Sequence, residues 1–167
     1  MSEYLTQGIT SQDELLIKGP VWHYTDSKKH KNYLLVSTGS WLSPNVGLFQ
    51  HLVYESWDYD QIINLFGEKT HDDIVPEIID IFNNWWEKVK TITHLSRQSK
   101  PFPPVKGGEG GLSYSPWRIQ SSISSAIEKL GTNTSCFLCG KPEMVDEVRS
   151  ILEELGVASE DITFEKY

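Results

Sequence analysis

A short polar turn follows a fully apolar predicted strand, and its residue types suit phosphate binding. After the strand, expected over residues 33–37, come Thr38, Gly39, Ser40, Trp41, Leu42, Ser43 and Pro44. Ser43 is placed to cap a helix that we expect to end near residue 55, and Pro44 to occupy its first position. Unpaired amides and the dipole at a helix N-terminus favour a bound anion. Taken alone, the turn leaves two interpretations open, a pyrophosphate site or an ordinary strand-to-helix turn with Trp41 packed against a neighbour.

Ser96 and Arg97 follow another predicted strand, residues 91–95, and suit the sugar end of a nucleotide. A guanidinium matches a ribose 2′-phosphate, whereas a carboxylate matches a free 2′-hydroxyl. Lys100 is close in sequence, and no Asp or Glu stands at the tip of this strand. The pair therefore favours NADP over NAD; the alternative is a surface arginine at the end of a strand.

In the C-terminal part of the chain, a cysteine stands next to a glycine that could let a ligand lie close to the backbone. Cys139 and Gly140 follow a strand expected over residues 134–138, and Pro142 begins the segment that becomes a helix. The buried face of that helix is defined by apolar residues at helical spacing, namely Met144, Val145, Val148, Ile151, Leu152 and Leu155. Gly140 would allow a ligand to approach the backbone closely, with the helix N-terminus facing it.

Cys136 and Cys139 do not predict a metal or redox site. They span the end of a strand, so their side chains tend to opposite faces, and no second cysteine pair completes a zinc site. The five histidines show no ligand spacing with one another or with the cysteines. We therefore expect no metal, and we expect Cys136 to be a small core residue.

All these segments lie just after predicted strands of one sheet. Strands are expected over residues 33–37, 62–66, 91–95, 134–138 and 162–165, and helices over 43–55, 72–90, 117–130 and 144–155, with a loop over 98–112. This alternation predicts an α/β fold, a doubly wound five-stranded parallel sheet with helices on both faces. Ligands bind such sheets beyond the carboxyl ends of the strands, where the strand order reverses. The segments to search are therefore residues 38–44, 67–70, 96–100 and 139–142.

Composition sets the broad class. A chain of 167 residues with 38% apolar residues is long enough for one domain with its own core. The formal charge of −8 disfavours a nucleic-acid partner. No apolar run approaches the roughly twenty residues that span a bilayer. Two cysteines and no evident leader predict a cytoplasmic location.

The C-terminal pattern resembles the end of the NAD(P)-binding domain in the ferredoxin–NADP reductase family. The matching features are the Cys139-Gly140 strand edge, the helix after it, and Glu165 and Tyr167 at the end of the chain. Residues 38–44 are similar to the family's Gly-Thr-Gly-x-Ala/Ser-Pro turn, and residues 96–97 to the Ser-Arg pair of its NADP-preferring members. Trp41 departs from the pattern, because it stands where the family has its second glycine, and an indole there could cover the phosphate site.

The resemblance implies hydride transfer between nicotinamide C4 of NADP or NAD and FAD. The residues implied to hold the pyrophosphate and the adenosine end are Thr38, Gly39, Ser40, Ser43, Pro44, Ser96 and Arg97. Those implied at the reacting centre are Cys139, Gly140, Pro142, Met144, Glu165 and Tyr167, with Cys139, Glu165 and Tyr167 in the catalytic roles.

The resemblance also divides the chain and suggests its partners. Residues 1–30 resemble the end of a flavin-binding barrel and a linker, and residues 31–167 the NAD(P)-binding domain. The rest of the barrel is absent, so we expect FAD from a missing domain or a partner subunit. We also expect ferredoxin or another electron carrier. We favour a fragment of a longer protein.

Two further interpretations remain open. One is a degenerate dinucleotide fold that acts as a docking or regulatory module without nucleotide turnover, with Trp41 filling the phosphate site and residues 85–86 contacting a partner. The weaker one is a doubly wound domain that binds a mononucleotide such as FMN.

Overall fold

The computed structural model of this chain describes residues 30–52, 59–74, 76–78, 80, 89–99 and 111–166. The side chain of Trp41 falls outside this description, as do those at positions 50, 51, 111 and 112. The predictions for residues 1–29, for residues 85–86, for Lys100 and for Tyr167 also lie outside the described residues.

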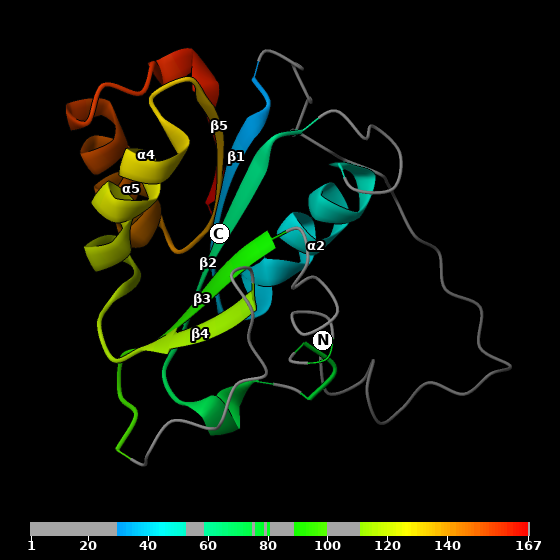
Figure 1. The fold of residues 1–167 in the computed structure, drawn as a ribbon. Coiled ribbons are helices and arrows are strands. Elements are labelled where there is room, and N and C mark those ends of the chain that lie inside the picture. Colours follow the sequence, from blue (N-terminus) through cyan, green and yellow to red (C-terminus); the bar gives the residue numbers. More distant parts are fainter. Residues whose placement is uncertain are drawn as a thin grey trace, which may run out of the picture.

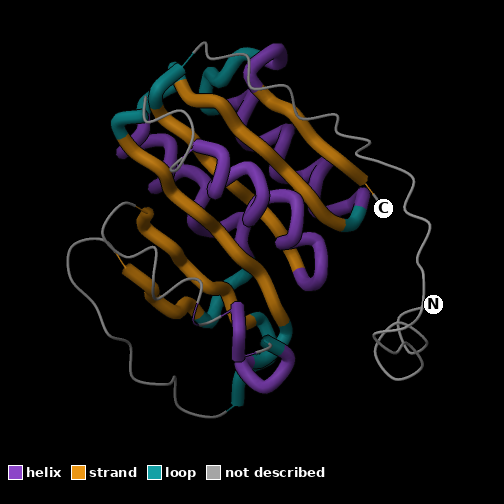
Figure 2. The backbone as a smooth tube through the Cα atoms, turned by 90° about the vertical axis from the view of Figure 1, so that its right-hand side faces the viewer, coloured by secondary structure: helices purple, strands orange, loops and turns teal. Residues whose placement is uncertain are grey.

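The described part of the chain is built on one parallel sheet with helices on both of its faces (Figures 1 and 2). The strands are β1 (Asn32–Thr38), β2 (Gln61–Glu68), β3 (Val89–Leu95), β4 (Gly111–Ser115), β5 (Thr134–Gly140) and β6 (Ile162–Lys166). Their order is β4-β3-β2-β1-β5-β6, with every pairing parallel. The predicted doubly wound sheet is confirmed. The strand order reverses between β1 and β5, next to the turn after β1, because β2 to β4 are added on one side of β1 and β5 and β6 on the other.

Helices cover the sheet in two layers. Helix α2 (Leu42–His51) lies on one face, and α4 (Ile123–Leu130) and α5 (Pro142–Glu154) lie on the other (Figure 1). Short 3-10 helices are η1 (Gly39–Trp41), η3 (His71–Asp73), η4 (Ile119–Ser122) and η5 (Ser159–Asp161). No helix in the described ranges is long and apolar enough to cross a membrane.

Strand β1 illustrates how the sequence builds these layers. Leu34 and Val36 belong to the buried cluster on the α4–α5 side, whereas Tyr33 and Leu35 belong to the cluster on the α2 side. Because successive strand residues point to opposite faces, a continuous apolar run is buried on both sides at once. Each such fully buried aliphatic side chain stabilises the fold by roughly 1.5–3 kcal/mol.

The described ranges contain one strand more than the sequence predicts. Residues 111–115 form β4, which pairs with β3 at one edge of the sheet, whereas the prediction had a loop through residue 112. The error arose because the segment opens on glycines and holds only two apolar residues. Leu112 and Tyr114 alternate with Ser113 and Ser115, which is the period-two pattern of a half-buried strand.

Several helix boundaries also differ from the prediction. Helix α2 begins at Leu42, so Ser43 and Pro44 lie inside its first turn, and Ser43 Oγ donates a hydrogen bond to the carbonyl of Ser40 at 3.3 Å. The predicted capping role of Ser43 and the first-position role of Pro44 are therefore wrong. The segment expected to be helical from residue 117 begins at Ile119, and residues 71–73 form η3 rather than the start of a long helix.

Candidate functional site

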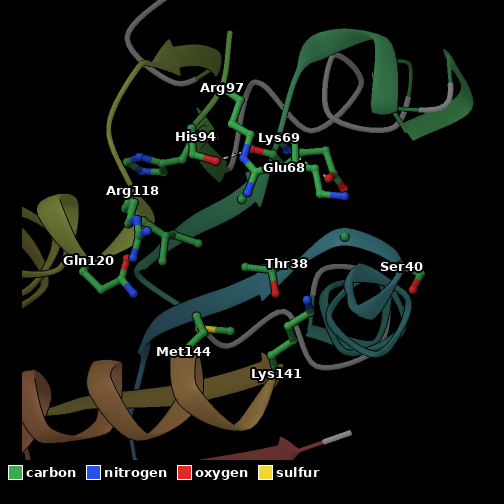
Figure 3. A pocket seen from close by; sticks show the side chains of 14 residues that line it. Thr38, Ser40, Glu68, Lys69, His94, Arg97, Arg118, Gln120, Lys141 and Met144 are labelled. Atoms are coloured by element: carbon green, nitrogen blue, oxygen red, sulfur yellow. Dashed lines mark hydrogen bonds between the residues drawn. The ribbon is translucent and has the colours of Figure 1, made fainter.

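A cavity of about 540 Å³ opens at the carboxyl ends of the strands, on the side of the sheet that carries η4 and α5 (Figure 3). Five segments that are distant in sequence contribute its walls. They are Thr38–Ser40 after β1, Gly67–Lys69 at the end of β2, His94 with Ser96 and Arg97 at the end of β3, Arg118–Gln120 at η4, and Lys141 with Met144 at α5. This volume is in the range typical of small-molecule sites.

Four cations among the described residues line this cavity: Lys69, Arg97, Arg118 and Lys141. Arg97 and Arg118 lie on the wall formed by the ends of β3 and β4, and Lys141 lies on the opposite, α5 side (Figure 3). Within the described ranges none of the four takes part in an ion pair. A concentration of unpaired positive charge, in a chain whose formal charge is −8, favours an anionic ligand with several charges.

The backbone beside the cavity requires glycine at two positions, Gly39 and Gly140. Gly39 has φ +59°, a left-handed conformation that glycine adopts without steric cost, and it turns the chain from β1 into η1. A Cβ placed on Gly140 would lie 2.5 Å from Met144 Cε and 2.6 Å from Thr38 Oγ1. The close approach between β5, β1 and α5 therefore depends on the missing side chain of Gly140.

His94 connects β3 to the wall that carries Arg118. Its side chain is 1% exposed, and Nδ1 lies 3.0 Å from the carbonyl oxygen of Trp117. Because a carbonyl oxygen only accepts, Nδ1 carries the proton of the neutral ring. Burial lowers the pKa of His94, although its hydrogen bond with Trp117 opposes this effect. A neutral histidine thus fixes the backbone immediately before Arg118.

The structure brings together part of the predicted site. Of the residues proposed for phosphate and adenosine binding, those that line the cavity are Thr38, Gly39, Ser40, Ser96 and Arg97, and Met144 joins them from α5. The predicted residues that do not line it are Ser43, Pro44, Cys139, Gly140, Pro142 and Glu165. Backbone hydrogen bonds from Ser96 N–H to the Glu68 carbonyl (3.1 Å) and from Arg97 N–H to the Lys69 carbonyl (2.8 Å) fix the end of β3 against that of β2.

Cys139 of β5 and Glu165 of β6 are register partners on neighbouring strands. Cys139 pairs in register with Ser37 of β1 on one side and with Glu165 of β6 on the other. The Cys139 side chain is fully buried, and neither cysteine forms a disulfide. Cys136 lies in the core on the α4–α5 side, and burial, with the nearby charge of Asp161 second, raises the pKa of its thiol to about 12.

Sequence reasoning missed eight residues that line the cavity, namely Gly67, Glu68, Lys69, His94, Arg118, Ile119, Gln120 and Lys141. Four of them lie in segments 67–70 and 139–142, which were singled out by position but not by residue type. Arg118, Ile119 and Gln120 were missed because they follow β4, the unrecognised strand. No group of three or more side chains that could ligate a metal is found in the described ranges.

Comparisons with known proteins agree with this architecture. No protein-family model matches the chain. The reductase component of propane 2-monooxygenase from Rhodococcus jostii is 25% identical over 166 residues, which cover 98% of this chain and 43% of that protein. NADH-cytochrome b5 reductase 2 from Aspergillus oryzae is 24% identical over 178 residues, covering 97% of this chain and 52% of that protein. The chain therefore spans about half the length of the curated relatives it matches.

Solved structures share the fold. The CS-b5R domains of human Ncb5or, in an NAD+ form, match with a TM-score of 0.64 at 15% identity, over 86% of this chain and 39% of that chain. A flavohemoglobin from Malassezia yamatoensis with bound FAD and heme matches with a TM-score of 0.61 at 16% identity, over 85% and 33% of the two chains.

The fold and the relatives define the class: this chain is similar to the NAD(P)-binding, C-terminal half of ferredoxin reductase-type oxidoreductases. The predicted resemblance is thereby confirmed. The comparisons do not favour a docking module without nucleotide turnover, and the tryptophan side chains on which that interpretation depends lie outside the described residues.

Proposed function

We propose that this chain is the NAD(P)H-binding domain of a flavin-dependent oxidoreductase. It presents nicotinamide C4 for hydride transfer to or from FAD, which a flavin-binding domain or subunit holds. The observation that carries the proposal is the convergence of Lys69, Arg97, Arg118 and Lys141 on one cavity beside the Gly39 turn. A dinucleotide bears several phosphate charges and fits such a site.

Different residues of the site bind different parts of the dinucleotide in this proposal. Thr38, Gly39 and Ser40 offer backbone and hydroxyl groups to the pyrophosphate, and Ser43 and Pro44 hold the following turn of α2. Arg97, supported by Ser96, binds the adenosine end of the dinucleotide, where its guanidinium suits a 2′-phosphate. Pro142, at the first position of α5, and Met144 shape the wall next to Gly140.

The chemistry itself belongs to the bound dinucleotide, which supplies the hydride. The protein's contribution is orientation and exclusion of water. Cys139, Gly140 and Glu165 line the reacting centre in our proposal, since their register places them side by side at the ends of β5 and β6. Tyr167 closes the nicotinamide position.

Ferredoxin or another carrier is the proposed electron partner, and the cytoplasmic location stays a prediction.

The test of the proposal is the Arg97→Ala variant, titrated with NADPH and NADH by calorimetry. Loss of a charge-assisted contact to a phosphate should weaken NADPH binding about tenfold or more, and NADH binding by less than about threefold. The control is Arg149→Ala, which removes an equal charge from a position on α5 that does not line the cavity, where Arg149 pairs with Glu153. If Arg97→Ala leaves both affinities at the wild-type values, or if the folded wild type binds neither dinucleotide, the proposal is wrong.

A further inference from the structure

Glu68 is the only carboxylate among the described residues that line the cavity, and it stands among four cations. An acidic group in a site built for anions works against the binding that the rest of the site favours. The simplest structural explanation would be that Glu68 neutralises one of these cations. The contacts of Glu68 exclude that explanation.

The Glu68 side chain pairs with none of the four cations in the described ranges. Its Oε1 accepts a hydrogen bond from the backbone N–H of the adjacent Lys69 at 2.9 Å. Its Oε2 points to the Gly39 turn, where a Cβ placed on Gly39 would lie 3.4 Å from it. The carboxylate is therefore held at the turn that faces the cavity, and among the residues that the structure describes it forms no salt bridge.

Two segments of the proposed site meet Glu68. Its side chain lies at the Gly39 turn, and its backbone carbonyl accepts the N–H of Ser96, the residue before Arg97. A fixed negative charge at this junction repels every ligand phosphate, and the repulsion increases with the number of phosphate charges. NADPH carries one phosphate monoester more than NADH, which adds a charge of about −1.5 to −2 at neutral pH.

From this placement we propose that Glu68 is a specificity-determining residue. Its carboxylate counteracts the attraction of Arg97 for the 2′-phosphate. It therefore lowers the affinity for NADPH more than the affinity for NADH, which lacks that phosphate. This inference rests on the proposed function and deepens it, because it names the charge of the cofactor as the property that the cleft discriminates. Arg97 attracts the additional phosphate and Glu68 penalises it, so the balance between the two side chains sets the preference.

The decisive variant is Glu68→Gln, which keeps the shape of the side chain and the amide oxygen that can accept from Lys69 N–H. Calorimetric titration of the full chain should show NADPH affinity increased about tenfold and NADH affinity increased by no more than about threefold. The shift in the NADPH to NADH ratio should shrink at high salt, because screening weakens the repulsion. Glu128→Gln is the matched control, since it removes an equal charge from an exposed position on α4, and it should leave the ratio unchanged.

Three outcomes would overturn the inference. An unchanged ratio in Glu68→Gln, with both dinucleotides still bound, would refute it while leaving the proposed function intact. Weaker NADH binding in the variant would show that Glu68 accepts hydrogen bonds from the ribose instead of acting through charge. Absence of binding by both the wild type and the variant, with melting curves that show folded protein, would refute the proposed function and this inference together.

Discussion

At the scale of single residues, one wall of the cavity depends on a histidine whose pKa is lowered by burial. His94 is buried, neutral and hydrogen-bonded to the carbonyl of Trp117, and so it fixes the chain immediately before Arg118. Its Nε2 is buried and has no hydrogen-bond partner in the described part of the chain. Protonation would place a charge in a site that cannot solvate it, next to a wall that already carries cations.

The stability of the protein should therefore depend on His94 at mildly acidic pH. Burial lowers the pKa of His94 below the ordinary histidine value of 6.5, so the unfolded chain takes up this proton first as pH falls. The contribution of neutral His94 is fully present above its unfolded pKa, and it is lost as pH falls through the lowered pKa of the folded state. Between about pH 7.5 and about pH 5.5, urea unfolding should show a larger loss of stability for the wild type than for His94→Asn.

His71→Asn serves as the control for this measurement, because His71 lies on η3 with its ring at the edge of Tyr114. It should lose stability on acidification as the wild type does. An equal pH dependence for the wild type and His94→Asn would contradict the assignment of His94 as the buried neutral group.

At the scale of elements, the close approach of β1, β5 and α5 positions the cavity. Gly140→Ala introduces a Cβ that meets Thr38 Oγ1 and Met144 Cε, and Thr38 cannot yield easily because its β-branched side chain is stiff. We expect this variant to lose about 1–3 kcal/mol of stability and to bind dinucleotide more weakly, since two lining residues must move. Urea unfolding and calorimetric titration measure the two effects.

Gly156→Ala separates the binding effect from instability. Gly156 has φ +90°, the nearest group to an added Cβ is Thr132 Cγ2 at 3.6 Å, and neither residue lines the cavity. It should lose about 1 kcal/mol through backbone strain while keeping the wild-type affinity. If Gly140→Ala binds as tightly as Gly156→Ala, the proposed role of the β5–α5 junction is wrong.

The sequence predicted the elements with strong apolar periodicity and missed those without it. Five strands and the α5 helix were recognised because buried apolar runs leave a clear pattern, as in residues 33–37 of β1. Strand β4 was missed, because it is short and half polar, and the residues of η4 that follow it were missed in consequence. The positive charge of the cavity could not be predicted from the sequence either. Lys69, Arg118 and Lys141 belong to no motif, and they come together only because the strand order places their segments around one cavity.

At the scale of the whole molecule, positive charge is concentrated where the strand order reverses. The chain has 23 acidic and 15 basic residues, yet the described residues that line the cavity include four cations and one carboxylate. Such a field attracts an anionic ligand over a distance of about 8 Å at physiological ionic strength. Binding that depends on these charges must weaken as salt is added.

The most direct test of the central claim is calorimetric titration of the wild-type chain with NADPH and NADH in parallel, at low and at high salt. We predict saturable binding of both dinucleotides at one site, with affinities that decrease as the salt concentration increases. A folded chain that binds neither dinucleotide at low salt would contradict the claim that this cleft is a nucleotide site.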